Sequence, residues 1–375
     1  MPTPTPQNQA AWLSAKCCTP LEVRKAPYTS PGPGEIVVKN AALAINPVDG
    51  GKQALGDIML SYIKYPFILG CDVAGDVVEV GRGVERFKVG DRVIGHAIAG
   101  AQVSNKASEG AFQHYTVIRQ HLAAVIPATI PFDKACVLPL ALTTSAYGLF
   151  HADCLNLPAP QVPASPPTGE AVIITGGASS VGSSAIQLAK SAGYEIYTTA
   201  SPKNFDYVKQ LGASHVYDYH SSSLVADMVA GLRGEKVAGA YAIGNGSVET
   251  CMQVLRQSQG SKLVVYASIP LPESFPTSTL GTAQFVGRAV FWMGSTNIKS
   301  KLKGVQAKFV DCKHFWHTDG AVSRIYQQFL PQALERGQFV PAPEPMVVGT
   351  GLEKVQEAME IQKKGVSARK VVVLL

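Results

Sequence analysis

Two patterns of apolar and polar positions divide the chain. Over the first 120 residues, short apolar segments are separated by glycine and charged turn residues, which is typical of an antiparallel β module. The strands predicted there are 35–39, 77–80, 89–94 and 111–117. From Ala171 onward, apolar strands alternate with segments of helical length, which predicts βαβ units and therefore a parallel sheet.

The second region contains six predicted strands, enough for a doubly wound sheet. They are 172–175, 195–199, 215–217, 238–243, 262–266 and 288–293. Helices are predicted at about 181–192 and 248–257, and the proline-rich segment 156–167 is predicted to be an exposed loop. After residue 312 we expect helices at 322–336 and 352–364, then a strand at 370–375.

The composition is typical of a folded globular protein. The chain has 375 residues, 46% of them hydrophobic and 16% charged, so it can bury a large core and lacks the signature of a disordered protein. A net charge of +6 is mild and scattered along the chain. That balance favours an anionic ligand, and we expect no nucleic-acid partner.

The cysteines and the N-terminus indicate the compartment. Seven cysteines occur without a C-x-x-C pair, which fits reduced thiols. The polar start, 1–10, lacks the basic and apolar regions of a signal peptide, and no stretch predicts a transmembrane helix. We therefore expect a cytoplasmic protein with no membrane partner.

A glycine-containing turn provides the first candidate site. The run Thr175-Gly-Gly-Ala-Ser-Ser-Val-Gly182 follows an apolar strand and opens a helix, as a dinucleotide-binding turn does. In G-x-G-x-x-G spacing, a serine takes the middle position. Its small residues would let a pyrophosphate reach the helix N-terminus; the alternative is a tight turn with no ligand. The candidate cofactor residues are Gly177, Ser179, Ser180, Val181 and Gly182.

The second strand of this unit indicates which nucleotide would bind. An NAD site usually has Asp or Glu at the end of this strand for the ribose hydroxyls, and none is present here. Ser201 and Lys203 follow instead, and a hydroxyl with a cation favours a 2′-phosphate. NADPH is therefore the expected cofactor. Alternatively, Ser201 only caps its helix and Lys203 is a solvated surface charge.

Together these features resemble the medium-chain dehydrogenase/reductase family. The resemblance is carried by the segments 44–49, 66–81, 89–93, 175–182 and 367–373 and covers almost the whole chain. It implies an α/β fold in which a GroES-like, β-rich catalytic domain (1–145 and 312–375) accompanies a Rossmann NADP(H)-binding domain (146–311). The run 201–206 and the proline-rich insertion are most similar to fungal quinone-reductase-like and trans-acting enoyl reductases.

The same resemblance indicates where zinc ligands would lie if the protein bound zinc. Zinc-dependent members need Cys and His at two motif positions, which here are Asn46 and Cys71. A catalytic zinc needs three N, S or carboxylate ligands, and no cysteine cluster for a structural zinc lies between 72 and 135. The run 312–317 contains one cysteine and two histidines, but no second group of metal-ligating residues accompanies it elsewhere in the sequence. We therefore do not interpret it as a metal site. We predict no metal.

Without zinc, the resemblance implies hydride addition to an activated C=C (enone or enoyl) or to a quinone. Candidate catalytic residues are Asn46, Lys52, Tyr62 and Tyr65. The family often places a lysine where this chain has Gly51, which puts Lys52 one position late, and both tyrosines could equally be packed rings. Asn46 could hold substrate or the nicotinamide ribose, or only form the turn before its proline.

Two further residues are assigned to the cofactor by position. Thr144 matches a family threonine near the nicotinamide carboxamide, with a helix-start hydroxyl as the alternative. Tyr219 follows the third predicted strand and could pack near the adenosine phosphate, or be an ordinary strand aromatic.

Other functions remain open at this stage. The enzyme could act on a small molecule, or as a trans-acting enoyl reductase on a carrier-bound chain in a polyketide assembly. It could also be a cofactor-binding interaction protein with little catalysis. A homodimer could form through the last strand, within 284–292, because an unpaired sheet edge can pair with a second copy.

Overall fold

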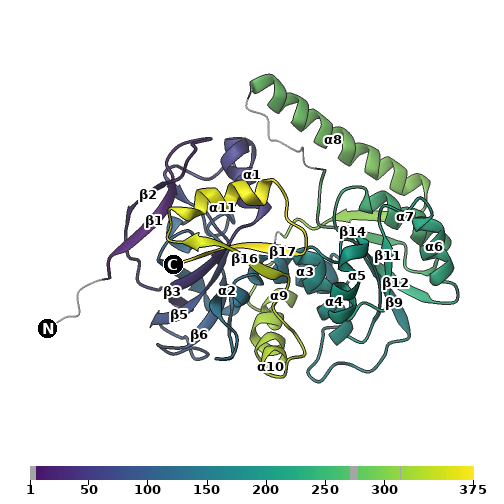
Figure 1. The fold of residues 1–375 in the computed structure, drawn as a ribbon, viewed down its shortest axis with the longest axis horizontal. Coiled ribbons are helices and arrows are strands. Elements are labelled where there is room, and N and C mark those ends of the chain that lie inside the picture. The colour runs from purple at the N-terminus through teal and green to yellow at the C-terminus, as the bar shows by residue number, and fades with distance from the viewer. Residues whose placement is uncertain (1–5, 271–277, 313) are drawn as a thin grey trace. The chain divides into compact units, whose positions relative to one another are not determined.

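The computed structural model describes residues 6–270, 278–312 and 314–375 (Figure 1). Contacts divide the chain into two compact units. The β-rich unit comprises Met1–Leu140, Glu273–Thr282 and Glu344–Leu375, and the parallel-sheet unit comprises Ala141–Pro272 and Ala283–Pro343. This division assigns 312–343 to the parallel-sheet unit, whereas the sequence-based expectation returned to the first domain at residue 312.

The β-rich unit is built on one large sheet and one small one. The large sheet has the order β16-β17-β3-β5-β6-β8, with β7 also paired to β3; all its pairs are antiparallel except β16 with β17. The small sheet has the order β2-β1-β4. The strands are β1 (Asn8–Leu13), β2 (Glu22–Ala26), β3 (Glu35–Ala44), β4 (Phe67–Ile68), β5 (Asp72–Val80), β6 (Arg92–His96), β7 (Tyr115–Arg119), β8 (Ala123–Val125), β16 (Glu344–Thr350) and β17 (Arg369–Leu374).

Short helices complete this unit and close its core. They are α1 (Pro47–Leu55), η1 (Gly56–Ile58), η2 (Ala107–Glu109), η3 (Gln120–Leu122), α2 (Phe132–Ala135) and α11 (Lys354–Lys363). The core includes Ile36, Val73, Phe112 and Val371, so segments distant in sequence share one apolar interior. The predicted antiparallel module and its C-terminal return strand are confirmed.

The parallel-sheet unit is a doubly wound sheet with the order β11-β10-β9-β12-β14-β15 and a short β13 paired to β12. Every pair is parallel. The order reverses between β9 and β12, which is where sheets of this class bind ligands. The strands are β9 (Glu170–Ile174), β10 (Glu195–Ala200), β11 (His215–Asp218), β12 (Lys236–Ala242), β13 (Gln259–Gly260), β14 (Leu263–Tyr266) and β15 (Gln306–Phe309).

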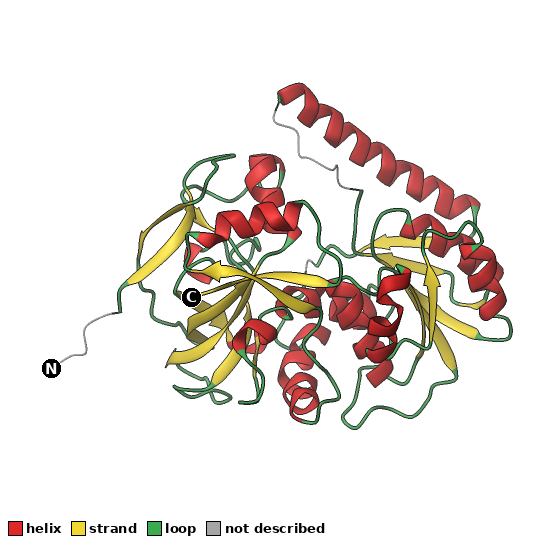
Figure 2. Cartoon of the chain, in the orientation of Figure 1, coloured by secondary structure: helices red, strands yellow, loops and turns green. Residues whose placement is uncertain are grey.

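Helices cover both faces of this sheet (Figure 2). They are α3 (Pro139–Phe150), α4 (Ser180–Ser191), η4 (Pro202–Asn204), α5 (Phe205–Gln210), α6 (Leu224–Gly231), α7 (Ser247–Gln257), α8 (Thr279–Leu302), α9 (Ala321–Arg324), η5 (Ile325–Phe329) and α10 (Leu330–Glu335). The core beneath α6 and α7 includes Ile173, Met228, Val254 and Val264. The proline-rich segment 156–167 is a loop, as predicted.

One predicted strand is wrong. Residues 288–293 lie inside the 24-residue helix α8, and the sixth strand is β15. A short apolar run does not by itself distinguish a strand from a helix, and the glycines that bound this run, Gly287 and Gly294, are both accommodated inside the helix. The homodimer hypothesis based on a strand in 284–292 therefore loses its structural basis. Among the described residues, no helix is long and apolar enough to cross a membrane.

Candidate functional site

The turn between β9 and α4 is held against β10. The amides of Gly176 and Gly177 donate to Oγ1 and to the carbonyl of Thr199, at 3.1 and 2.9 Å. A Cβ on Gly177 would lie 2.4 Å from Oγ1 of Thr198, and a Cβ on Gly182 would lie 2.2 Å from the carbonyl oxygen of Gly176. Both positions therefore require glycine, because any side chain would collide with the turn.

The first turn of α4 presents unpaired backbone amides. Ser179 is the N-cap, and its Oγ accepts from the amide of Gly182 at 3.0 Å while its carbonyl accepts from Ser183 at 2.8 Å. The amides of Ser180 and Val181 have no partner among the residues that the structure describes. Two free donors at the positive end of a 12-residue helix suit a phosphate group. The predicted cofactor residues 177–182 therefore form a cradle that fits the pyrophosphate of a dinucleotide.

Ser201 and Lys203 follow the neighbouring strand. Because β9 and β10 are parallel, both residues lie at the same edge of the sheet as the glycine turn. Oγ of Ser201 accepts from Asn204 Nδ2 at 3.1 Å. Lys203 is exposed and has no ion-pair partner within the described part of the chain. Its ammonium group is thus available for an anionic ligand.

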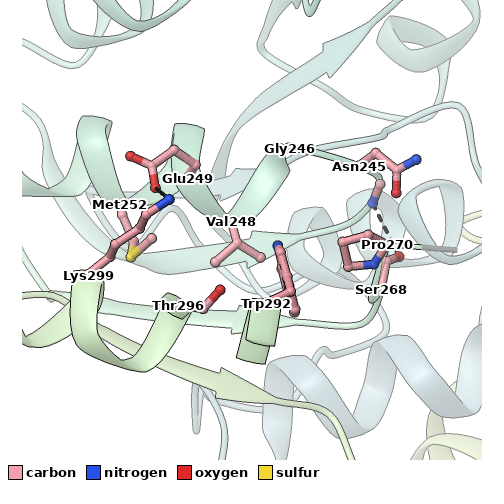
Figure 3. A pocket seen from close by; sticks show the side chains of 11 residues that line it. Asn245, Gly246, Val248, Glu249, Met252, Ser268, Pro270, Trp292, Thr296 and Lys299 are labelled. Carbon is pink, nitrogen blue, oxygen red and sulfur yellow. Dashed lines mark hydrogen bonds and ion pairs between the residues drawn. The ribbon is translucent and has the colours of Figure 1, made fainter. Parts of the chain in front are cut away.

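A hollow lies beyond the carboxyl ends of β12 and β14 (Figure 3). The loop at Gly244 lines it, and the amide of Gly244 donates to Oγ of Ser268 at 3.2 Å. Trp292 of α8 lines one side and packs edge-on to Tyr266, with ring centroids 5.7 Å apart. None of the residues that line this hollow was among the site residues predicted from the sequence. The signal available was the run Gly244-Asn-Gly246 directly after a predicted strand.

The structure places the two remaining cofactor candidates differently. Thr144 lies in the second turn of α3, half-buried, and its carbonyl accepts from the hydroxyl of Tyr241 at 2.9 Å. It is therefore not at a helix start. Tyr219 follows β11 at the same sheet edge as the turn, is 51% exposed, and packs against His220 with ring centroids 4.1 Å apart.

The β-rich unit contains a buried polar cluster around Asn46. Asn46 is the N-cap of α1, and its backbone amide donates to Asp49 Oδ2 at 2.8 Å. Its side-chain Nδ2 donates to Asp72 Oδ2 at 2.8 Å, and its Oδ1 accepts from Lys370 Nζ at 2.5 Å. Lys370 also pairs with Asp72 at 3.0 Å, and neither side chain is more than 5% exposed. Both ends of the Asn46 amide are thus engaged inside the protein.

Burial controls ionisation in this cluster. It raises the pKa of Asp49 to about 7, with a further rise from the charge of Asp72 and an opposing effect of the hydrogen bond from Asn46. Burial lowers the pKa of His96 to about 4 against the attraction of Asp72. It also holds the pKa of the Cys71 thiol well above its ordinary value. At neutral pH, His96 is therefore neutral and Cys71 keeps its proton.

These two titrations predict opposite effects of pH on stability. Asp49 keeps its proton to about pH 7 when folded but loses it near 3.8 when unfolded, so its contribution falls as pH rises between these values. His96 gains its proton only near pH 4 when folded but near 6.5 when unfolded, so its contribution rises with pH over that interval. Relative to wild type, Asp49→Asn should therefore become more stable as pH rises from about 4 to 7.

Urea unfolding at several pH values tests this prediction. His96→Gln should show the reverse trend relative to wild type between about pH 4 and 6.5. A constant stability difference between Asp49→Asn and wild type across the interval would show that Asp49 titrates normally.

The other catalytic candidates lie in the segment after α1. Lys52 is 1% exposed, and its ammonium donates to the carbonyls of Gly56 and Leu60 at 3.0 and 3.2 Å. Burial lowers its pKa. Lys52 Nζ also lies 5.1 Å from the centre of the Tyr65 ring. Lys52 therefore links α1 to the segment that follows it, through the carbonyls of Gly56 and Leu60, and its ammonium lies over the ring of Tyr65.

The two tyrosine hydroxyls have separate partners. The hydroxyl of Tyr62 donates to the carbonyl of Gly100 at 2.5 Å, and that of Tyr65 donates to Asp57 Oδ1 at 3.0 Å. Burial raises the pKa of both, and the hydrogen bond to Asp57 raises that of Tyr65 further. Each hydroxyl thus keeps its proton at neutral pH.

Comparison with known families agrees with this architecture. Residues 32–128 match the Alcohol dehydrogenase GroES-like domain, and residues 180–305 match the Zinc-binding dehydrogenase family. The first range covers most of the antiparallel sheet, and the second begins at α4 and ends just before β15.

Whole-chain relatives extend the match to both units. The dehydrogenase pigH of Monascus ruber is 50% identical over 370 residues, covering 99% of this chain and 100% of the relative. The trans-enoyl reductase himH of Aspergillus japonicus is 38% identical over 371 residues, covering 98% of this chain and 97% of the relative. The CurK enoyl reductase has a similar fold, with a TM-score of 0.71 at 22% identity, covering 98% of this chain and 99% of that one. The chain belongs to the medium-chain dehydrogenase/reductase family of oxidoreductases.

The family name raises the question of zinc, and the buried cluster does not fit it. Asn46 offers only a neutral amide, which already binds Asp72 and Lys370, and the Lys370 ammonium neutralises Asp72. No group of three or more His, Cys, Asp or Glu side chains within the described ranges is arranged to hold a metal ion. The range that matches the zinc-binding family, 180–305, contains none of these cluster residues.

Proposed function

We propose that the protein is a zinc-independent, NADPH-dependent reductase of an activated C=C bond. The observation that carries the proposal is the cradle at the start of α4, with free amides at Ser180 and Val181 and the unpaired cation of Lys203 at the same sheet edge. Donors and a cation placed in this way suit a pyrophosphate and a 2′-phosphate.

The choice of an activated C=C follows from the site in the β-rich unit. The Lys370 ammonium binds Asn46 and pairs with Asp72 in the buried cluster, which supports a reaction in which no metal polarises a carbonyl. A bond that is already electron-poor needs no such help. Relatives named as trans-enoyl reductases favour an enoyl substrate over a quinone.

When bound, the dihydronicotinamide supplies hydride to the β-carbon of the enoyl group. The chain holds the dinucleotide phosphates at residues 177–182 and 201–203, and delivers a proton to the α-carbon. Tyr62 and Tyr65 are the candidate donors because both hydroxyls are protonated at neutral pH, with water as the alternative. Lys52 positions Tyr65, and Asn46 fixes the start of α1.

Cofactor choice is tested at Lys203. Wild type should bind NADPH at least tenfold more tightly than NADH, a difference of about 1.4 kcal/mol, and Lys203→Ala should remove most of this preference. The measurement is a titration followed by cofactor fluorescence, and a panel of enones, enoyl thioesters and quinones then identifies the acceptor.

Lys209→Ala is the matched control, because Lys209 is an exposed lysine on the next helix with no ion-pair partner among described residues. It should keep the preference of wild type. An equal loss in both variants would show a general charge effect, and an unchanged preference in Lys203→Ala would place the 2′-phosphate elsewhere.

A second candidate substrate is an enoyl chain carried by a protein in a polyketide assembly. The names of himH and tndF as trans-enoyl reductases favour it. Reduction of a carrier-bound enoyl group uses the same chemistry as reduction of a free enoyl compound. The enzyme would additionally need a surface that binds the carrier protein.

A further inference from the structure

The excess positive charge of the chain is not scattered, as first expected, but is concentrated in one segment. Between Glu273 and Asp311 there is no acidic residue. The same stretch contains five cations: Arg288, Lys299, Lys301, Lys303 and Lys308. The net charge of the whole chain is only +6, so the rest of the molecule is close to neutral and this stretch stands out.

Most of this segment is α8 (Figure 1), which carries several large apolar side chains that are exposed. Trp292 and Thr296 face the parallel-sheet unit, and Thr296 is 5% exposed. Phe291, Ile298 and Leu302 follow at intervals of seven and four residues and so share another face, where they are 77%, 63% and 82% exposed. Large apolar side chains grouped in this way mark an interaction surface.

The cations gather at the C-terminal end of α8, next to α7. Glu249 of α7 forms an ion pair with Lys299 (Figure 3) and a second ion pair with Lys303, so one carboxylate neutralises only part of the charge of two ammonium groups. Lys301 and Arg256 have no ion-pair partner within the described ranges. A surface hollow lined by Gln253, Arg256, Gln257 and Lys303 lies between the two helices. Cationic side chains thus border the hollow beside the C-terminal end of α8.

We propose that this surface, the outer face of α8 with its flanking cations, binds an acidic protein domain that carries the enoyl substrate. Charge complementarity selects the occupant. A second copy of this chain would oppose two surfaces on which cations outnumber the single carboxylate of Glu249, which is unfavourable. A lipid surface is disfavoured because the cations cluster at one end of the helix instead of following its length. The identity of the carried group rests on the proposed function.

The test compares the same enoyl group attached to a carrier protein and attached to a small thiol. The but-2-enoyl group is presented on the phosphopantetheine arm of an acidic fatty-acid acyl carrier protein, and as its N-acetylcysteamine thioester. For wild type, kcat/KM should be at least tenfold higher with the carrier, and this advantage should shrink as salt is added. Lys301→Glu and Phe291→Ser should each lower the carrier value about three- to tenfold and leave the free thioester value unchanged.

Two exposed positions in the β-rich unit provide matched controls. Lys25→Glu makes the same charge change, and Val89→Ser removes an apolar side chain that is 62% exposed. Both should behave as wild type with both substrates. The proposal would be overturned by equal kcat/KM for the carrier-bound and the free thioester substrate. Equal effects of the α8 variants and the control variants on kcat/KM would also overturn it.

The experiment distinguishes failure of the reductase function from failure of the proposed docking surface. If neither enoyl compound is reduced, the reductase assignment fails, while calorimetric binding of the same carrier still tests the surface. Binding that weakens in Lys301→Glu and Phe291→Ser supports the surface. Absence of binding, a dimer that depends on Phe291, or binding to anionic vesicles in place of the carrier would overturn it.

Discussion

Replacing Lys370 with methionine is expected to lower the free energy of unfolding by about 3–5 kcal/mol. Lys370 and Asp72 are buried at 5% and 0% exposure, with Nζ and Oδ2 3.0 Å apart. Without the ammonium, the Asp72 carboxylate would stay buried with its negative charge no longer neutralised by Lys370, although the Asn46 amide and the backbone amide of Leu140 would still donate to it. Urea unfolding followed by circular dichroism measures the loss.

Two variants separate this effect from a general loss of charge. Lys354→Met breaks an exposed pair with Glu357 and should cost no more than about 0.5 kcal/mol. Asp72→Asn combined with Lys370→Met removes both charges and should recover part of the stability. If Lys370→Met costs no more than Lys354→Met, the buried pair does not stabilise the β-rich unit.

The second large effect is expected at the glycine turn. Gly182→Ala would place a Cβ 2.2 Å from the carbonyl oxygen of Gly176, so the turn must open. Opening it moves the amides of Ser180 and Val181 away from the phosphate. The loss of two hydrogen bonds to a charged group, about 1.5 kcal/mol each, corresponds to roughly hundredfold weaker NADPH binding.

Gly294→Ala is the control for this substitution. Gly294 lies in α8, where a Cβ would meet nothing within 4 Å, so nucleotide binding should not change. Circular dichroism checks that Gly182→Ala remains folded. Wild-type affinity for NADPH in a folded Gly182→Ala would show that the phosphates bind away from the start of α4.

Local signals in the sequence predicted much of this molecule. Short apolar segments separated by turn residues identified the antiparallel module, and β-α alternation identified the parallel sheet, because both patterns are local in the sequence. The turn at 175–182 was recognised because glycine and serine occur where a strand ends and a helix begins. Its unpaired amides depend only on that local geometry.

The parts that sequence reasoning missed depend on contacts between distant residues. Asn46 and Lys370 lie 324 positions apart, so nothing local indicates that they share a hydrogen bond. The strand β15, Gln306–Phe309, is short and largely polar, whereas the apolar run before it resembles a strand and forms a helix. The sequence likewise did not indicate that the ammonium of Lys52 binds the carbonyls of Gly56 and Leu60, because these contacts depend on how the segment after α1 folds back.

The most direct test of the central claim follows the hydride. Chelator-treated protein is incubated with NADPH dideuterated at C4 and the N-acetylcysteamine thioester of but-2-enoic acid, and the product is analysed by mass spectrometry. The account predicts a saturated thioester with one deuterium at the β-carbon and one proton from the protein or solvent at the α-carbon. Unchanged substrate, or reduction that appears only when zinc is added back, would contradict it.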